Sequence, residues 1–327
     1  MSFVETLSLA LVNLTSPPVL AFALGLVAVS IKSDLRLPEP VYQALSIYLL
    51  LAIGVKGGVS LSDATWSDVA LPLLATVILG IVIPLLAFVG LRATSRLDTV
   101  NRGALAAHYG STSLVTFTAT LVFLDTIGVT YEGFVTTLLA TMEVPGIIVG
   151  LLLAARGAKT NVSWSGTLRE VLTGRSIVLL VGGLGVGVIT GANGYQGIEP
   201  LFSGLFPGIL TLFLLELGIV AGRRLQDIGL GGWPVVAFAI WFPLVSGSLG
   251  VIAGQMAGLS LGGATVLGVM SASASYIAAP AAVRLALPEA SPGIYLTAAL
   301  GVTFPFNLVA GIPLLHSLST FLADLSL

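Results

Sequence analysis

Long stretches of apolar residues alternate with short polar junctions along almost the whole chain. A helix needs about 20 mostly apolar residues to cross the hydrocarbon core of a bilayer. Cutting the sequence at charged residues and turn signals predicts ten transmembrane helices. Their expected ranges are 17–31, 40–55, 68–91, 102–124, 133–155, 175–192, 202–221, 232–257, 262–286 and 292–321.

The composition excludes a soluble protein. Hydrophobic residues make up 56% of the 327 residues and charged residues only 9%, whereas soluble domains contain about 25% charged residues. A soluble fold of this size could not cover its surface with so few charges, so soluble enzymes and nucleic-acid-binding proteins are excluded. The chain has no cysteine, which rules out disulfides and thiolate metal sites and leaves the redox compartment undetermined.

The positive charges are distributed unevenly between the two sides of the predicted bundle. Of the 13 Lys and Arg residues, all except Lys56 lie in the junctions after the odd-numbered helices. Cytoplasmic junctions of membrane proteins carry the excess of positive charge. This pattern predicts that both termini lie on the extracytoplasmic side of the membrane, which we expect to be the plasma (inner) membrane.

The two halves of the chain resemble each other, at an offset of 164 residues near the start of each half and of 160 further along. The matched pairs are Gly54 and Gly218, Gly58 and Gly222, Asp63 and Asp227, Ser111 and Ser271, Ser113 and Ser273, Gly133 and Gly293, and Pro145 and Pro305. Because each half has five predicted helices, the second copy is inverted relative to the first, as in many secondary transporters. We expect a first repeat over 1–160, a cytoplasmic linker over 161–174 and a second repeat over 175–327.

The predicted fourth and ninth helices have the least membrane-like sequences, HYGSTSLVT from His108 and SASASYIAAP from Ser271. Gly, Ser and Pro at mid-depth predict broken helices. The second half of each would start with free N–H groups and a partial positive charge, which suits a small anion. The expected anion-binding residues are Gly110, Ser111, Thr112, Ser113, Ser271, Ser273, Ser275 and Tyr276. Close packing of small residues is the alternative interpretation.

Glu143 lies in the middle of the predicted fifth helix. An acidic side chain inside a transmembrane helix is functional by default. A carboxylate with hydroxyl and carbonyl oxygens forms a hard-oxygen site of the kind that Na⁺ prefers. The expected Na⁺ site consists of Glu143 with Thr303, Asn307 and Thr116. A protonated Glu143 that hydrogen-bonds a neighbouring helix is the alternative, and the second buried acid, Glu216, is interpreted as structural.

Several short motifs in order resemble the sodium-dependent bicarbonate transporter superfamily of the SbtA type. The motifs are SPPVLAF from Ser16, LPEP from Leu37, IGVKGG from Ile53, GSTS from Gly110, EVP from Glu143, the segment 280–284 and TFP from Thr303. The resemblance implies an all-α polytopic membrane protein with two inverted five-helix repeats, broken fourth and ninth helices and a fold related to bile-acid symporters and sodium/proton antiporters. It also implies a homotrimer, with helices one, two, six and seven as a scaffold and the others as a moving elevator core.

The same resemblance implies symport of bicarbonate with Na⁺, which would be a coupling ion rather than a cofactor. One departure is Tyr276, which stands where the family has an acid, and Ala278 and Ala279 replace small polar residues. A lost carboxylate would weaken a cation ligand or change the anion. The short junction over 156–175 argues against a regulatory partner resembling PII proteins.

Three alternative functions remain compatible with the sequence. These are transport of another small organic anion, sodium/proton antiport, and a receptor that senses an anion without transporting it. Antiport would favour paired acids at mid-membrane, which the Tyr276 position does not supply. The chain lacks HExxH, P-loop and GxSxG motifs, so we do not expect an enzyme.

Overall fold

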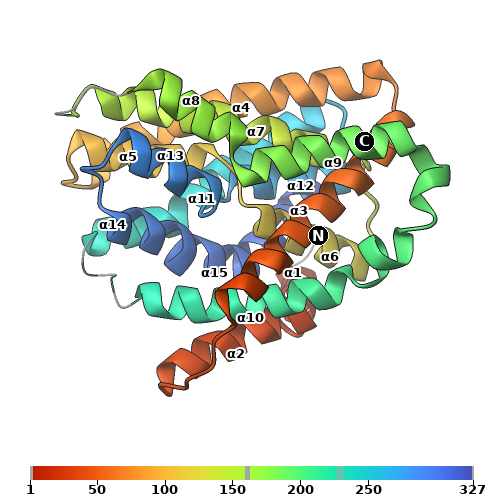
Figure 1. Cartoon of the computed structure of the whole chain (residues 1–327), viewed down its shortest axis with the longest axis horizontal. Helices are drawn as coiled ribbons and strands as arrows, with labels where there is room; N and C mark the ends of the chain where they lie inside the picture. The colour runs from red at the N-terminus through yellow and green to blue at the C-terminus, as the bar shows by residue number, and fades with distance from the viewer. Residues whose placement is uncertain (1–2, 159–162, 226, 228, 230, 326–327) are drawn as a thin grey trace.

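The computed structural model describes residues 3–158, 163–225, 227, 229 and 231–325, and every regular element within them is a helix (Figure 1). Seven described helical segments are long and apolar enough to cross a membrane, and they coincide with seven of the predicted ones. They are α3 (Glu39–Ser62), α4 (Trp66–Thr94), α7 (Val135–Ala155), α9 (Arg175–Tyr195), α10 (Phe206–Leu225), α11 (Gly232–Met256) and the continuous segment Pro292–Leu325. The chain therefore has the architecture of a polytopic membrane protein.

The other three predicted segments are shorter or divided. The first corresponds to α2 (Pro17–Ser30), which is bent by 64° against the preceding α1 (Phe3–Leu14). The predicted fourth helix consists of α5 (Thr99–Gly110) and α6 (Leu114–Thr126). The predicted ninth consists of α12 (Leu261–Ser271) and α13 (Ala278–Ala286). Both helices are thus interrupted where the sequence predicts it.

The last long segment alternates between α-helix and π-helix along its length. It runs through α14 (Pro292–Leu296), the π-helix η3 (Thr297–Thr303), α15 (Phe304–Phe306), the π-helix η4 (Asn307–Gly311) and α16 (Ile312–Leu325). Continuing the π-helical pattern would pair Pro313 with the carbonyl of Leu308, but proline has no N–H to donate. The Asn13 side chain donates to that carbonyl instead, which fixes the end of α1 to this segment.

Glycines allow two pairs of helices to approach until their backbones touch. In the contact of α3 with α9, a Cβ atom on Gly187 would overlap the carbonyl oxygen of Val55. In the contact of α2 with α10, which lie together at the lower edge of Figure 1, a Cβ on Gly218 would overlap the carbonyl oxygen of Phe22. Small residues bring transmembrane helices together in this way.

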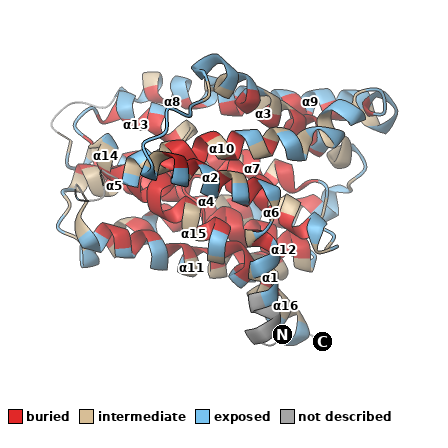
Figure 2. Cartoon of the chain, turned by 90° about the horizontal axis from the view of Figure 1, so that it is seen from below, coloured by how far each residue is buried: buried red, intermediate tan, exposed pale blue. Residues whose placement is uncertain are grey.

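Buried residues gather at the centre of the bundle, and exposed ones lie on the outer faces of the peripheral helices (Figure 2). Many of the exposed residues are large and apolar, including Leu24 of α2, Leu71 of α4 and Ile189 of α9. Exposed apolar surface of this extent is typical of a face that contacts lipid. The first and last helices, α1 and α16, pack against each other.

The predicted linker over 161–174 contains a helix that the apolar pattern did not predict, α8 (Trp164–Thr173). Residues 161–162 lie outside the described residues. Thr167 and Val171 are buried, and α8 packs against α13 and α9. The segment is therefore a packed part of the bundle surface rather than an extended connection.

The first prediction concerns the contact of α3 with α9. Gly187→Ala should destabilise the protein by about 1–3 kcal/mol, because the added methyl group forces two backbones apart. The matched control is Gly185→Ala on the same helix, where an added Cβ would meet nothing within 4 Å. Thermal unfolding of the purified variants measures both effects. Equal melting temperatures for the two variants would contradict the close contact.

Candidate functional site

The interruption between α5 and α6 lies against α7. A Cβ atom on Gly146 of α7 would overlap the carbonyl oxygen of Gly110, the last residue of α5. Gly110 itself is confined between Gly146 and Pro84 of α4. Because Gly146 is one helical turn beyond Glu143, this contact brings the break close to that carboxylate.

Hydrogen bonds join the two interrupted helices to each other. The backbone N–H of Ser113 donates to Oγ of Ser273 over 2.9 Å, and Oγ1 of Thr112 lies 3.2 Å from the same oxygen. In the opposite direction, the N–H of Ser275 donates to the carbonyl of His108 over 2.8 Å. The interruptions, which are far apart in the sequence, therefore form one connected structure.

The helices that follow the two interruptions, α6 and α13, both start at this connection. Oγ of Ser113 caps α6 by accepting the N–H of Thr116, and Oγ of Ser275 accepts the N–H of Ala279 in the first turn of α13. Other N–H groups in a first helical turn have no partner within the helix, and the turn carries a partial positive charge. The starts of α6 and α13 therefore offer donors to the same region.

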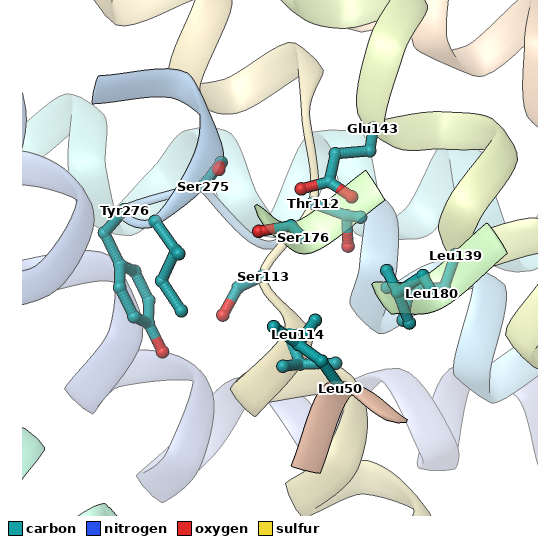
Figure 3. A pocket seen from close by; sticks show the side chains of 11 residues that line it. Leu50, Thr112, Ser113, Leu114, Leu139, Glu143, Ser176, Leu180, Ser275 and Tyr276 are labelled. Atoms are coloured by element: carbon teal, nitrogen blue, oxygen red, sulfur yellow. The ribbon is translucent and has the colours of Figure 1, made fainter. Parts of the chain in front are cut away.

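A small cavity lies where the two half-helices meet α3, α7 and α9 (Figure 3). Four of the eight predicted anion-binding residues line it, and Figure 3 shows their side chains around one space: Thr112, Ser113, Ser275 and Tyr276. Leu50, Leu114, Leu139 and Leu180 form its apolar wall. The cavity therefore combines hydroxyl groups and helix N-termini with an apolar wall.

The other four predicted anion-binding residues do not line the cavity. Ser273 lies behind it, where its hydroxyl donates to the carbonyl of Met270 over 2.7 Å and accepts from Ser113. Gly110 is in the packing contact with α7. The hydroxyls of Ser111 and Ser271 are buried and have no hydrogen-bond partner among the described residues. Three of the four repeat-matched serines, Ser111, Ser271 and Ser273, thus occupy different surroundings from Thr112 and Ser275.

Glu143 lines the same cavity and points into it from α7 (Figure 3). Its side chain is only 5% exposed, and Oε2 has no hydrogen-bond partner among the described residues. A buried carboxylate oxygen without a donor is costly unless a cation or a proton compensates it. The carboxyl group is therefore the one in this cavity that a bound cation or a proton must compensate.

The other three predicted Na⁺ ligands do not line the cavity with Glu143. Thr303 accepts from the Tyr109 hydroxyl and donates to the carbonyl of Ala239, each over 2.7 Å. Asn307 donates to the carbonyl of Ala272 over 2.9 Å, and Oδ1 of Asn307 has no partner among the described residues. Thr116 follows the cap of α6. In the described part of the chain, no three His, Cys, Asp or Glu side chains form a metal cluster.

Ser176 is a cavity residue that the sequence pattern did not predict. It is buried in the first turn of α9 and faces the cavity beside Glu143 and Thr112 (Figure 3). Neither a repeat match nor a neighbouring polar motif marks this serine in the sequence. Ser176 supplies a third element, besides the two broken helices, with a hydroxyl at the cavity.

A much larger cleft of about 800 Å³ adjoins the cavity and shares Glu143, Ser176 and Tyr276 with it. Three cations line this cleft, Arg175 of α9, Arg224 of α10 and Arg284 of α13. Each belongs to a junction after an odd-numbered predicted helix. The cavity is therefore connected to the side of the bundle where the positive charges gather.

The opposite ends of α3 and α7 are in close contact. A Cβ on Gly57 would overlap the side chain of Thr136, and a Cβ on Gly133 would overlap that of Ser60. Among the described residues no cleft of comparable size lies between these ends, whereas Glu39 at the start of α3 and Ile147 of α7 both line the large cleft. The bundle is therefore open beside the cavity on one side and packed on the other.

A family model described as the Na⁺-dependent bicarbonate transporter superfamily matches residues 17–320, which is nearly the whole chain. The chain therefore belongs to this superfamily. No curated protein matches the chain. The family is one of transporters, so the chain is not expected to be an enzyme, and it implies bicarbonate and Na⁺ as the transported substrates.

The second prediction concerns the connection between the broken helices. Ser273→Ala should lower the free energy of unfolding by about 1–3 kcal/mol, because it leaves the buried N–H of Ser113 without an acceptor. Ser271→Ala is the matched control, since that buried hydroxyl has no partner to lose. Chemical or thermal unfolding of the purified variants compares them. Equal stability would show that the Ser113–Ser273 bond does not hold the breaks together.

Proposed function

We propose that this member of the Na⁺-dependent bicarbonate transporter superfamily is a secondary active transporter that couples entry of a small anion, bicarbonate first, to entry of Na⁺. The observation that carries the proposal is the cavity in which two half-helix starts and one buried carboxylate face each other. The helix starts suit an anion and the carboxylate suits a cation. A site with both features offers a partner to each ion, and the cavity, which has a volume of about 10 Å³, must widen to admit both.

The anion would be bound by neutral donors. Backbone N–H groups at the starts of α6 and α13 and the hydroxyls of Thr112, Ser113 and Ser275 surround the cavity. The buried hydroxyl of Tyr276 lies beside the Ser113 side chain, and the Tyr276 ring packs edge-on against Phe304 with the centroids 5.5 Å apart. Tyr276 can therefore donate to an anion at a position where an acid would repel it.

Na⁺ would be bound against Glu143. The neighbouring hydroxyl oxygens of Thr112, Ser113 and Ser176 are the hard ligands that such a cation takes. At a membrane potential of −100 mV, the entry of one anion is opposed by ~2.3 kcal/mol, and one accompanying Na⁺ cancels that electrical work. Coupling to Na⁺ therefore makes uptake of a monovalent anion feasible.

The packing supports two inverted five-helix repeats over 1–160 and 175–327. Gly54 of α3 packs against Gly183 of α9, and its repeat partner Gly218 of α10 packs against Gly25 of α2. If the two halves of the chain are exchanged, α3 takes the place of α10 and α9 that of α2, so the contact of α3 with α9 becomes the contact of α10 with α2. Likewise α5 packs on α4 and α7, while α12 packs on α11 and α16. A two-fold relation between the halves explains these paired contacts.

The same arrangement supports an elevator mechanism. The scaffold would consist of α2, α3, α9 and α10, which also form the homotrimer, and the remaining spans would move as the core. The arginine-lined cleft would be the cytoplasmic opening, because positive charge gathers on that side, with both termini outside and the plasma membrane as the location. The described conformation is then inward-facing, with its outer side closed between α3 and α7.

Uptake by the purified protein in liposomes tests the function. We expect labelled bicarbonate to enter only with an inward Na⁺ gradient. A panel of labelled small carboxylates tests whether the protein transports a different anion, as the Tyr276 departure would allow. Proton release without anion uptake would indicate an antiporter. Anion binding without any flux would indicate a sensor and contradict the proposal.

The third prediction concerns the cation. Glu143→Gln keeps the shape of the side chain and removes its charge, so we expect Na⁺-dependent uptake to fall at least tenfold, corresponding to about 1.4 kcal/mol. The control is Glu216→Gln, because Glu216 accepts the N–H of Leu37 over 2.8 Å and does not line the cavity. That variant should lose stability without changing the Na⁺ dependence. Unchanged Na⁺ affinity in the Glu143 variant would make Glu143 structural.

The fourth prediction concerns movement of α7 past α3. The chain contains no native cysteine, so Ser60→Cys with Gly133→Cys places a single thiol pair at the closed outer contact. The side chains are near enough for a disulfide after a small shift. Oxidation should stop uptake, and a reductant should restore it. Oxidised single-cysteine variants are the controls, and full transport by the cross-linked protein would exclude sliding at this contact.

A further inference from the structure

A second cavity lies at the end of the bundle opposite the arginine-lined cleft. It has a volume of about 90 Å³ and is bounded by α3 and α10 on one side and by α6 and the start of α7 on the other. Thr136, Ser203 and Phe206 contribute to its wall. Because about 10–15 Å³ of such space is enough for one water molecule, this outer cavity has room for a small polyatomic ion.

The outer cavity contains Lys56, which is the only cation outside the positively charged junctions. Lys56 is exposed and forms no ion pair with any described residue. The carboxylate in the same cavity, Asp125, has another partner. Burial, the charge of Asp125 and a hydrogen bond to it raise the pKa of Tyr131, which keeps that phenol a neutral donor to Asp125. The ammonium group of Lys56 therefore has no counter-ion among the described residues.

The outer cavity is aligned with the central cavity along two helices. On α3, Leu50 lines the central cavity and Lys56 the outer one, about 9 Å further along at about 1.5 Å per residue. On α7, Glu143 lines the central cavity and Thr136 the outer one, about 10 Å apart by the same rise. The packing of Gly57 against Thr136 closes the space between them. The outer cavity therefore lies where an anion from outside would arrive before the core moves.

We propose that the outer cavity is an entry subsite in which Lys56 binds the anion before it reaches the central cavity. This inference rests on the proposed function and its orientation. A cation at the mouth of a narrow cavity raises the local anion concentration and the rate of capture. Thr136 and Ser203 supply hydroxyl donors, and Asp125 lowers the affinity enough for the anion to leave inward. The expected ligand class is a small monovalent anion such as bicarbonate.

Side-specific kinetics test the subsite. In right-side-out membrane vesicles, Lys56→Gln should raise the external KM for bicarbonate about threefold to tenfold and weaken its dependence on ionic strength. Lys56→Arg should restore a value close to that of the unaltered protein. Asp125→Asn should shift the external KM in the opposite direction, downward. In inverted vesicles, the KM measured from the cytoplasmic side should stay unchanged in all three variants.

These opposite shifts distinguish a subsite from a purely structural role of Lys56. If the role were structural, the substitutions would change the external and the cytoplasmic KM equally. An unchanged external KM in Lys56→Gln would overturn the proposal. It would also be overturned if that variant altered only the affinity for Na⁺, because the cavity would then serve the cation.

A second measurement does not depend on transport. An amine-reactive reagent should modify Lys56 in the purified protein, and bicarbonate should slow this reaction compared with sodium gluconate at the same ionic strength. Lys32, in a positively charged junction, is the internal reference, and peptide mass spectrometry quantifies both lysines. Protection of Lys56 alone would support the subsite even if liposome uptake contradicted symport. Equal modification rates with and without bicarbonate would exclude it.

Discussion

Two helices are interrupted in the middle of a membrane bundle, and the backbone groups released there must find partners without water. The structure meets this constraint by pairing the interruptions with each other. Ser113 donates to Ser273, and Ser275 donates to the carbonyl of His108. A third group, the carbonyl of Ala272, is satisfied by Asn307 from η4. The donors left at the starts of α6 and α13 are then available to a ligand, so the binding cavity follows from how the breaks are stabilised.

Close packing of backbones gives this paired structure its position. The contact of Gly110 with Gly146 fixes the first break against α7, one turn from Glu143. A larger residue at either position would push the break away from the carboxylate. The glycines of α3 and α9 similarly bring Leu50, Leu180 and Ser176 to the cavity wall. Van der Waals contact between small residues thus sets the geometry of polar groups that do not touch one another.

The sequence predicted the long helices, the two interruptions and the buried carboxylate, because each depends on local composition. It could not predict which hydroxyls face the cavity, since that depends on the path of the non-helical residues between the half-helices. Ser273 and Ser275 belong to one run of alternating serines, yet only Ser275 lines the cavity. Thr303 could not be placed from the sequence because its partners, Tyr109 and Ala239, come from distant helices. Ser176 was missed because nothing around it in the sequence is polar in a recurring pattern.

The position of Glu143 supplies a physical reason for coupling in the proposed mechanism. Along α7, Ile147 lines the arginine-lined cleft, Glu143 the central cavity and Thr136 the outer cavity. If the core slides outward, Glu143 must pass the apolar wall formed by Leu50 and Leu180 of the scaffold. Moving an uncompensated carboxylate through such a wall costs several kcal/mol, whereas a carboxylate paired with Na⁺ carries no net charge. The empty core with an ionised Glu143 would therefore move slowly. Anion alone would add a second negative charge, so Na⁺ must be bound before the core crosses readily.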